Sequence, residues 1–341
     1  MTAINADDLA RRLTAIIGRS EPDVAVGALE RLHGGASGLT YRAVVTGPRQ
    51  TRRLIAVKVA PPGLKPVKNR DVLRQARIMR LLRTAGTIPV PRVLFVDAGR
   101  PPEVPPLFAM EYVEGQCWEP ILDPVGTIPA AGEIRARELD VARNLGLLHA
   151  ASPTQLGLAT EPVVTLEGEL DRWARVIATI DDDLRPNCVS IGDRLRASLP
   201  SPVAPVLQHG DFRLGNTLAK EGRVRAVIDW EIWTVGDPRV DLAWYLMSTH
   251  SSKQRCAVRD VDGMPSDEEL VRVYQDTSGL AVTDLRWFEA FTQFKAAAIT
   301  GQIIKHNRRS DHPNDVVSSW DPDLPPTFLG TAAVLLADIV A

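Results

Sequence analysis

The sequence predicts an α+β protein with a small β-rich N-terminal lobe and a larger, mainly helical C-terminal lobe. Between residues 24 and 60, short runs of β-type residues alternate with turn residues, which is typical of antiparallel strands. After Gly115, apolar residues recur at helical spacing over several long segments. We therefore expect an N-terminal lobe of residues 1–112 and a C-terminal lobe of residues 113–341.

Apolar periodicity predicts helices in both lobes. The helical segments are residues 5–17, 70–83, 132–150, 167–180, 240–250, 267–276 and 284–307. Strand-like runs within 24–60 and 88–115 precede and follow the second helix, and we expect them to form one antiparallel sheet. Two stretches interrupt the helices of the C-terminal lobe, residues 203–230 and the Pro-rich residues 312–326.

Composition and charge narrow the class of protein. The 341 residues are 45% hydrophobic and 24% charged, as in soluble globular proteins. Lys and Arg number 40 against 42 Asp and Glu, and because nucleic-acid binders usually carry a basic excess, we expect no nucleic-acid partner. The three cysteines have neither disulfide-framework nor metal-ligand spacing, which favours a reducing compartment. They are Cys117, Cys188 and Cys256.

The two ends of the chain carry no targeting pattern. The N-terminal run "MTAINADDLARRL" has acids where a signal peptide needs a basic flank and an apolar core. The apolar C-terminal run "FLGTAAVLLADIVA" contains Asp338 and is too short to cross a bilayer. We therefore expect a cytoplasmic protein with no membrane partner. The oligomeric state stays open.

A short connector gathers polar side chains between two apolar segments. The run "HGDFRLGN" (residues 209–216) holds a histidine, an aspartate, an arginine and an asparagine. The run that follows, "NTLAKEGRVRAVIDW", has Glu221 and Gly222 at its centre and β-type residues on both arms, which predicts a hairpin. A turn at this point places Asn216 opposite Asp229, and the Cβ atoms of such cross-strand neighbours lie about 4.5–5.5 Å apart.

The open end of this hairpin has the chemistry of a magnesium site beside a base. Mg²⁺ prefers oxygen ligands, which Asn216 and Asp229 both carry. Asp211 lies five residues before Asn216 and can serve as a base without being a ligand. This spacing matches the phosphoryl-transfer template. Taken singly, Asp211 and Asp229 are explained as turn and cap residues; together, their spacing favours phosphoryl transfer.

The N-terminal lobe offers matching parts for a nucleotide. The run "HGGASGLTYRAVV" (residues 33–45) is a glycine turn between two strand-like runs. Lys58 lies inside the apolar run "RLIAVKVA", where an unpaired ammonium would be costly. A plain hairpin is the alternative explanation of the glycine turn, and an edge-strand lysine pointing at solvent is the alternative for Lys58. Their order along the chain resembles that of the kinase glycine loop and its lysine.

The combined run "HGDFRLGN…VIDWE…GDPRVDLAWYL" (residues 209–246) closely resembles the aminoglycoside phosphotransferase-like family of small-molecule kinases. Further family-like pieces are "GGASGLTYR", "AVKV", "VPRVLFVDAG", "FAMEYVEG" and "LGLLHA". The resemblance covers about residues 30–250, with weaker likeness beyond. It implies a bilobal protein-kinase-like fold, the cofactors ATP and Mg²⁺, and phosphate transfer to a hydroxyl of a small molecule.

The resemblance also implies roles for single residues. Asp211 would orient or deprotonate the acceptor hydroxyl, and Asn216 and Asp229 would hold Mg²⁺. Lys58 would bind the α- and β-phosphates. The glycine-loop residues that would cover the phosphates are Gly35, Ser37 and Gly38.

Other implied roles concern the hinge and the loop of Asp211. Backbone groups of Glu111 and Val113 would read the adenine edge, and Asp241 would brace the loop. Arg213 either neutralises charge on the transferring phosphate or forms a structural salt bridge. We expect the two histidines near these motifs to be packed rather than catalytic. They are His149 and His209.

Two positions depart from the family pattern. The helix after Lys58 should offer a glutamate to pair with it, but the best-aligned position is Gln75, which brings no charge. The position after Ser37 is frequently asparagine in relatives and is Gly38 here, which loosens the turn. Gln75 motivates an alternative function, a catalytically weak or inactive nucleotide-binding regulator.

A protein kinase is a third possible function. The lack of an "APE"-like motif after Asp229 argues against it.

The acceptor stays open between aminoglycosides, choline-like alcohols, sugars and hydroxy acids. Acidic residues 181–183 and 266–269 would suit a polycation, but a solvated loop and a capping box are the favoured explanations. The basic residues 305–309 would suit an anion, but also a helix C-terminus. Four aromatic residues would line a pocket or fill the core. They are Trp173, Trp233, Trp287 and Phe291.

Overall fold

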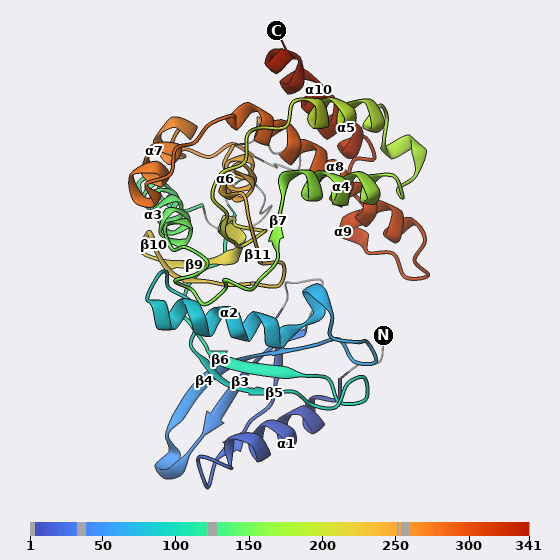
Figure 1. Ribbon diagram of the computed structural model, residues 1–341. Coiled ribbons are helices and arrows are strands. Elements are labelled where there is room, and N and C mark those ends of the chain that lie inside the picture. Colours follow the sequence, from blue (N-terminus) through green and yellow to red (C-terminus); the bar gives the residue numbers. More distant parts are fainter. Residues whose placement is uncertain are drawn as a thin grey trace. The chain divides into compact units, whose positions relative to one another are not determined.

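The computed structural model has the mixed α+β composition that the sequence predicts (Figure 1). It describes residues 4–32, 39–119, 121, 128–250, 252–253 and 259–340. Contacts divide the chain into two compact units. Unit 1 comprises Met1–Gln116, Asn216–Lys220 and Val224–Trp233, and unit 2 comprises Cys117–Gly215, Glu221–Arg223 and Thr234–Ala341.

Unit 1 is built on an antiparallel sheet. Its strands are β1 (Ala25–Val26), β2 (Glu30–Leu32), β3 (Leu39–Thr46), β4 (Arg52–Val59), β5 (Val93–Asp97) and β6 (Leu107–Glu111). The strands follow the order β1-β3-β4-β6-β5, and β2 pairs with β3. In β4, Lys58 pairs with Thr40 on one side and with Phe108 on the other, so it lies on an interior strand.

Two helices accompany this sheet, α1 (Ala6–Ile17) and α2 (Val72–Ala85). Helix α1 begins where the Asn5 side chain accepts hydrogen bonds from two backbone amides. It buries Leu9 and Leu13 in the same core as the sheet residues Val57 and Ala109. Helix α2 ends at Gly86, whose left-handed conformation favours glycine.

The predicted hairpin is present. Strands β9 (Thr217–Lys220) and β10 (Arg223–Val227) pair through a two-residue turn at Glu221 and Gly222, which both have positive φ angles. Gly222 suits this turn doubly, because an added Cβ would lie 2.9 Å from the Cβ of Ala136. The Val227 amide donates to the carbonyl of Pro89 at 2.8 Å, which ties β10 to the rest of unit 1.

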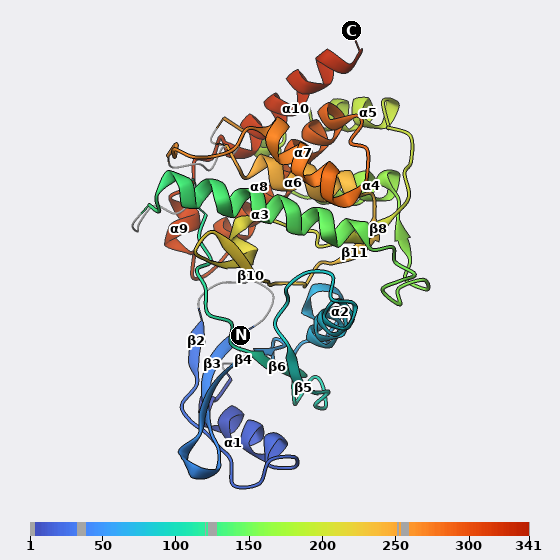
Figure 2. The same cartoon turned by 90° about the vertical axis from the view of Figure 1, so that its left-hand side faces the viewer.

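Unit 2 is mainly helical (Figure 2). Its helices are α3 (Ala131–Ala150), α4 (Leu166–Ile177), α5 (Cys188–Ala197), α6 (Pro238–Met247), α7 (Asp267–Ser278), α8 (Leu285–Arg308), α9 (Asp315–Ser318) and α10 (Leu324–Val340). A three-stranded sheet of β7 (Val163–Val164), β11 (Thr234–Gly236) and β8 (Val206–Gln208) leads into the 209–216 connector. Helix α8 packs against α4, α6 and α10, and α3 packs against α7.

Periodicity predicted five of these helices and missed three, α5, α9 and α10. Helix α10 begins inside the Pro-rich stretch that we expected to be irregular. Pro325 and Pro326 fall in its first turn, where a missing N–H costs no intrahelical hydrogen bond. Neither α10 nor another helix in the described part of the chain combines the length and the apolar character that crossing a membrane requires.

Candidate functional site

Lys58 forms a charged group with two carboxylates of unit 1, those of Asp229 and Glu231. Its Nζ donates to Oδ1 of Asp229 at 2.5 Å and lies 3.6 Å from Oε2 of Glu231. The Lys58 side chain is 8% exposed, so the alternative of a solvent-pointing edge lysine is wrong. A buried ammonium requires such partners, because removing one of them leaves an uncompensated charge.

Asn216 and Asp229 lie at the open end of the β9–β10 hairpin. The Ile228 amide donates to the Asn216 carbonyl at 2.9 Å, so Asn216 and the residue before Asp229 face each other. Asp229 has a φ of 63°, an uncommon conformation that aspartate tolerates better than most residues. Amide and carboxylate oxygens are the ligands that Mg²⁺ prefers, so these residues fit a magnesium ion chemically.

This donor set is too small for an all-protein metal cage. Among the described residues, no three His, Cys, Asp or Glu side chains gather to hold a metal. Mg²⁺ is commonly bound by only one or two protein carboxylates together with substrate phosphates. The pair is therefore compatible with an ion that arrives with a nucleotide.

The structure shows a different partner for Lys58 than the helix position we examined in the sequence. Gln75 on α2 is buried, and its side-chain amide donates to the backbone carbonyl of Asn69 at 3.4 Å. Glu231 stands near Lys58 instead. Sequence reasoning missed this role, although Glu231 is the last residue of the quoted run "VIDWE".

The remaining predicted nucleotide contacts are backbone groups or lie outside the described residues. Glu111 ends β6, and its amide donates to the carbonyl of Arg92 at 2.9 Å. The predicted hinge contacts concern backbone groups of Glu111 and Val113, and the Glu111 amide is engaged with Arg92. The three glycine-loop positions lie outside the described residues. They are Gly35, Ser37 and Gly38.

Asp211 forms a second charged cluster, in unit 2. Its Oδ1 accepts from the indole Nε1 of Trp244 at 2.7 Å. The Nε of Arg213 donates to both carboxylate oxygens at 3.2 Å, and Arg213 also pairs with Glu119. Although burial alone would lower it, the carboxylates of Asp211 and Glu119 raise the pKa of Arg213. Trp244 and Glu119 were not foreseen, because nothing in their local sequence marks them as neighbours of Asp211.

Asp241 braces the connector that carries Asp211, as expected. It lies on α6 and is fully buried, and its carboxylate accepts from the backbone amides of His209 at 2.6 Å and Gly210 at 2.8 Å. Although burial alone would raise it, the nearby His149 ring and the hydrogen bond from the Gly210 amide keep the pKa of Asp241 below its ordinary value. The carboxylate therefore stays charged and holds the loop.

Both histidines are packed residues, as the sequence indicated. The Nδ1 of His209 accepts from the Asp211 amide at 3.3 Å. The Nδ1 of His149 lies 2.9 Å from the hydroxyl of Tyr274. Each ring is buried, and each supports the loop or a helix contact.

The charged runs that we considered for an acceptor are explained by other contacts. Arg308 pairs with Asp181 and Asp183, and Arg309 pairs with Asp181, so the acidic and basic runs neutralise each other. Ser266 and Glu269 form a capping box at the start of α7.

The four aromatic residues are buried. Trp173, Trp287 and Phe291 belong to the core of unit 2. Trp233 belongs to unit 1, where the guanidinium of Arg74 lies 3.6 Å from its ring centroid.

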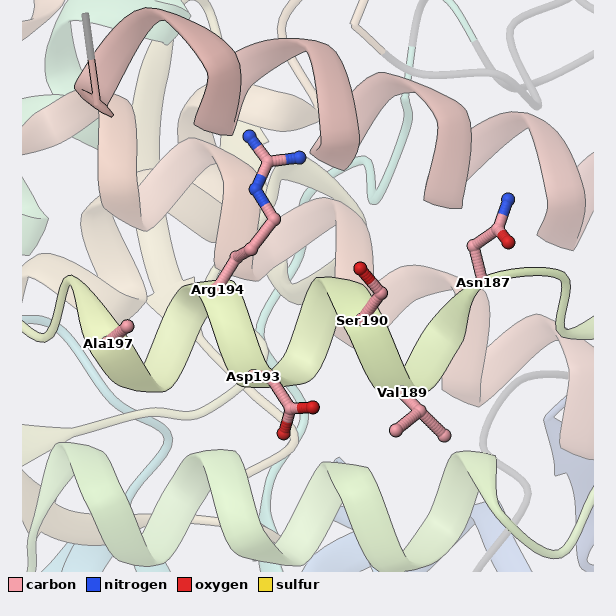
Figure 3. Close-up of a pocket in the computed structure, with 6 residues that line it drawn as sticks. All are labelled: Asn187, Val189, Ser190, Asp193, Arg194 and Ala197. Carbon is pink, nitrogen blue, oxygen red and sulfur yellow. The ribbon is translucent and has the colours of Figure 1, made fainter.

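A separate pocket lies over α5 (Figure 3). It shares no residue with the Asp211 cluster or the Lys58 group. Arg194, one of its lining residues, donates to the carbonyl of Ala333 on α10. The lining residues are Asn187, Val189, Ser190, Asp193, Arg194 and Ala197.

Solved structures share this fold. A candidate aminoglycoside phosphotransferase of Ralstonia eutropha superposes with a TM-score of 0.74 at 23% identity, covering 96% of this chain and 97% of that chain. A spectinomycin phosphotransferase, solved with ADP and spectinomycin, has a TM-score of 0.62 at 13% identity and covers 98% and 99%. A choline/ethanolamine kinase family protein of Mesorhizobium loti has a TM-score of 0.55 at 18% identity and covers 97% and 94%. These likenesses show the protein-kinase-like fold.

Curated relatives match the chain over much of its length. Acyl-CoA dehydrogenase family member 10 of Mus musculus is 28% identical over 321 residues, which are 89% of this chain and 29% of that protein. Acyl-CoA dehydrogenase family member 11 of Homo sapiens is 28% identical over 275 residues, 76% of this chain and 35% of that protein. The chain thus spans about a third of the length of these relatives. The model of the phosphotransferase enzyme family matches residues 28–276, and the chain belongs to that family.

Proposed function

We propose that this protein is an ATP- and Mg²⁺-dependent phosphotransferase that acts on a hydroxyl of a small molecule. The observation that carries the proposal is the pairing of Lys58 with Asp229 in unit 1. It joins the residue assigned to the phosphates with the residue assigned to the metal. The family membership supports the reaction type. The cytoplasmic location expected from the sequence is part of the same proposal.

The residues of unit 1 bind the nucleotide in this proposal. Lys58 contacts the α- and β-phosphates, and the carbonyl of Glu111 and the amide of Val113 hold the adenine edge. Mg²⁺ at Asn216 and Asp229 would neutralise charge on the β- and γ-phosphate oxygens. The glycine loop that covers the phosphates comprises Gly35, Ser37 and Gly38.

Unit 2 supplies the base. The Asp211 carboxylate accepts the proton of the acceptor hydroxyl as that oxygen bonds to the γ-phosphorus. The bond from the γ-phosphorus to the oxygen that bridges it to the β-phosphate breaks, and ADP leaves. Arg213 stabilises negative charge on the transferring phosphate. The indole of Trp244 holds Asp211 in position through its hydrogen bond.

The alternative function, a nucleotide-binding regulator without turnover, was motivated by the uncharged Gln75. This alternative is less favoured because Glu231 and Asp229 bring negative charge to Lys58 without a contribution from α2. Lys58 therefore has charged partners in spite of the substitution.

An ADP-release assay across a library of hydroxylated small molecules tests the proposal. The wild-type protein should turn over at least one acceptor. Asp211→Ala should lose turnover while ATP binding, followed by calorimetry, stays intact. ATP binding without turnover on any acceptor, together with an unchanged Asp211→Ala variant, would favour the regulator.

A further inference from the structure

Lys295 is a buried cation near Asp211, and it has no role in the reaction proposed above. It lies on α8 in the run "FKAAAIT", among apolar and small residues, and is 5% exposed. Its Nζ donates to the carbonyl of Gly210 at 3.3 Å. Within the part of the chain that the structure describes, no carboxylate oxygen lies within ion-pair distance of this ammonium.

Two indole rings take the place of a carboxylate partner. The ammonium lies 4.2 Å from the ring centroid of Trp244 and 5.7 Å from that of Trp173. Cation–π contacts of this kind contribute far less than the cost of desolvating a charge. Burial accordingly lowers the pKa of Lys295, although Glu169, Asp241 and Asp211 act to raise it.

The acids around Lys295 are engaged elsewhere. Glu169 accepts from the indole of Trp173, and Asp241 accepts from two backbone amides of the connector. Asp211 accepts from Trp244 and Arg213. An ammonium has three N–H donors, and the Gly210 carbonyl occupies one of them. The charge of Lys295 is thus left without an anion of its own.

Trp244 joins this ammonium to the proposed base. One face of its indole carries Lys295, and its Nε1 donates to Asp211. The Asp211 side chain is 28% exposed and Trp244 is partly buried, so Asp211 is the solvent-accessible member of this cluster. An acceptor that presents its hydroxyl to Asp211 would place its neighbouring groups near the Trp244 indole, which Lys295 also contacts.

We propose that Lys295 selects the acceptor by charge, and that the acceptor is a hydroxy acid whose carboxylate pairs with the Lys295 ammonium. A cationic acceptor would meet an uncompensated positive charge. It would also find the two indole faces already occupied by Lys295, although such faces are what otherwise attract an ammonium group. This inference rests on the proposed function, because Asp211 is taken as the site of the reacting hydroxyl.

Binding of matched small molecules tests the inference without requiring turnover. Binding is followed by tryptophan fluorescence, to which Trp173 and Trp244 contribute among the seven tryptophans, and calorimetry gives the affinities. The acids are glycolate, lactate, β-hydroxybutyrate and ω-hydroxycaproate, each compared with its amide; ethanolamine and isopropanolamine are the cationic counterparts. The wild-type protein should bind acids about tenfold or more tightly than amides, which is about 1.4 kcal/mol.

Two variants of Lys295 and one matched control complete the test. Lys295→Met should abolish the preference for acids, and Lys295→Arg should retain most of it. Lys305→Met removes the same charge from the same helix and should leave the preference unchanged, because Lys305 contacts the carbonyl of Thr179 instead. A structural role alone for Lys295 would change the melting temperature without changing the acid-to-amide ratio.

Several outcomes overturn the inference. These are a wild-type protein that binds no acid, that binds acids and amides equally, or that prefers the amines, and an acid preference that survives in Lys295→Met. The proposed function fails by a different result, namely no ADP release with any acceptor. Because the affinities from fluorescence and calorimetry do not require turnover, the two failures can be told apart.

Discussion

The ammonium of Lys58 donates a 2.5 Å hydrogen bond to Asp229, which lies 171 positions later in the chain. The two side chains come from β4 and from the segment after β10, and both belong to unit 1. The proposed phosphate-binding cation and the proposed metal-binding carboxylate therefore neutralise each other before any ligand binds. A change in the charge of either side chain therefore changes the electrostatic environment of the other.

Asp229→Ala removes the proposed metal ligand and the closest partner of Lys58. We expect turnover to fall by at least about a hundredfold, or about 2.7 kcal/mol in activation free energy. Mg·ATP should also no longer raise the melting temperature, because ligand binding to the folded state is what produces that shift. Glu103→Ala, at an exposed acid of unit 1, is the control. An Asp229→Ala protein that still responds to Mg·ATP would contradict the assignment.

Gln75→Ala and Glu231→Gln distinguish the two candidate partners of Lys58. Gln75 contacts the carbonyl of Asn69, so its loss should change turnover by less than about threefold. Glu231 stands 3.6 Å from Lys58, and neutralising it should lower turnover by about tenfold. The measurement is kcat and KM for ATP in both variants. A loss of orders of magnitude in Gln75→Ala would mean that the amide performs the missing glutamate's role.

Trp244→Phe removes the indole donor to Asp211 and keeps an aromatic ring next to Lys295. A hydrogen bond to a charged group contributes about 1.5–3 kcal/mol, so we expect kcat to fall by about tenfold or more. The KM for ATP should not change. Trp320→Phe, at a partly buried tryptophan of the same core, should leave kcat unaltered. An unchanged kcat in Trp244→Phe would show that Asp211 does not need this donor.

Glu138 on α3 makes folding pH-dependent. Burial raises its pKa from 4.5 to about 7, although the Tyr245 hydroxyl and the charge of Arg137 act to lower it. Between these values the folded protein binds more protons than the unfolded chain. The free energy of unfolding contributed by Glu138 is therefore fully present below pH 4.5 and decreases by about 3 kcal/mol as the pH rises to about 7.

Urea unfolding of the wild type and of Glu138→Gln checks this prediction. The difference in unfolding free energy between the two proteins should change by about 3 kcal/mol across that pH range. The exposed Glu133→Gln on the same helix provides the comparison and should show no such change. A constant difference between wild type and Glu138→Gln would mean that this carboxyl is already ionised in the folded state.

Local sequence patterns predicted much of the fold. Helix α8 was expected at residues 284–307 and spans Leu285–Arg308, because a helix reports its buried face through a regular spacing of apolar residues. The hairpin turn was expected at Glu221 and Gly222, because that turn type needs residues that accept positive φ angles. Helix α10 was missed because prolines in a first turn resemble prolines in a loop.

The sequence by itself determined the α+β fold class, the hairpin that carries Asn216 and Asp229 at its ends and, through the family resemblance, the packed roles of Asp241 and His209. Each of these depends on neighbours that are close along the chain or on a short motif. Only the tertiary structure decided that Glu231 accompanies Lys58, that Trp244 donates to Asp211, and that Lys295 lies against Trp244 with no anion of its own. These pairings join separate elements of a unit, and apolar periodicity specifies which face of an element is buried but not which side chain meets it there.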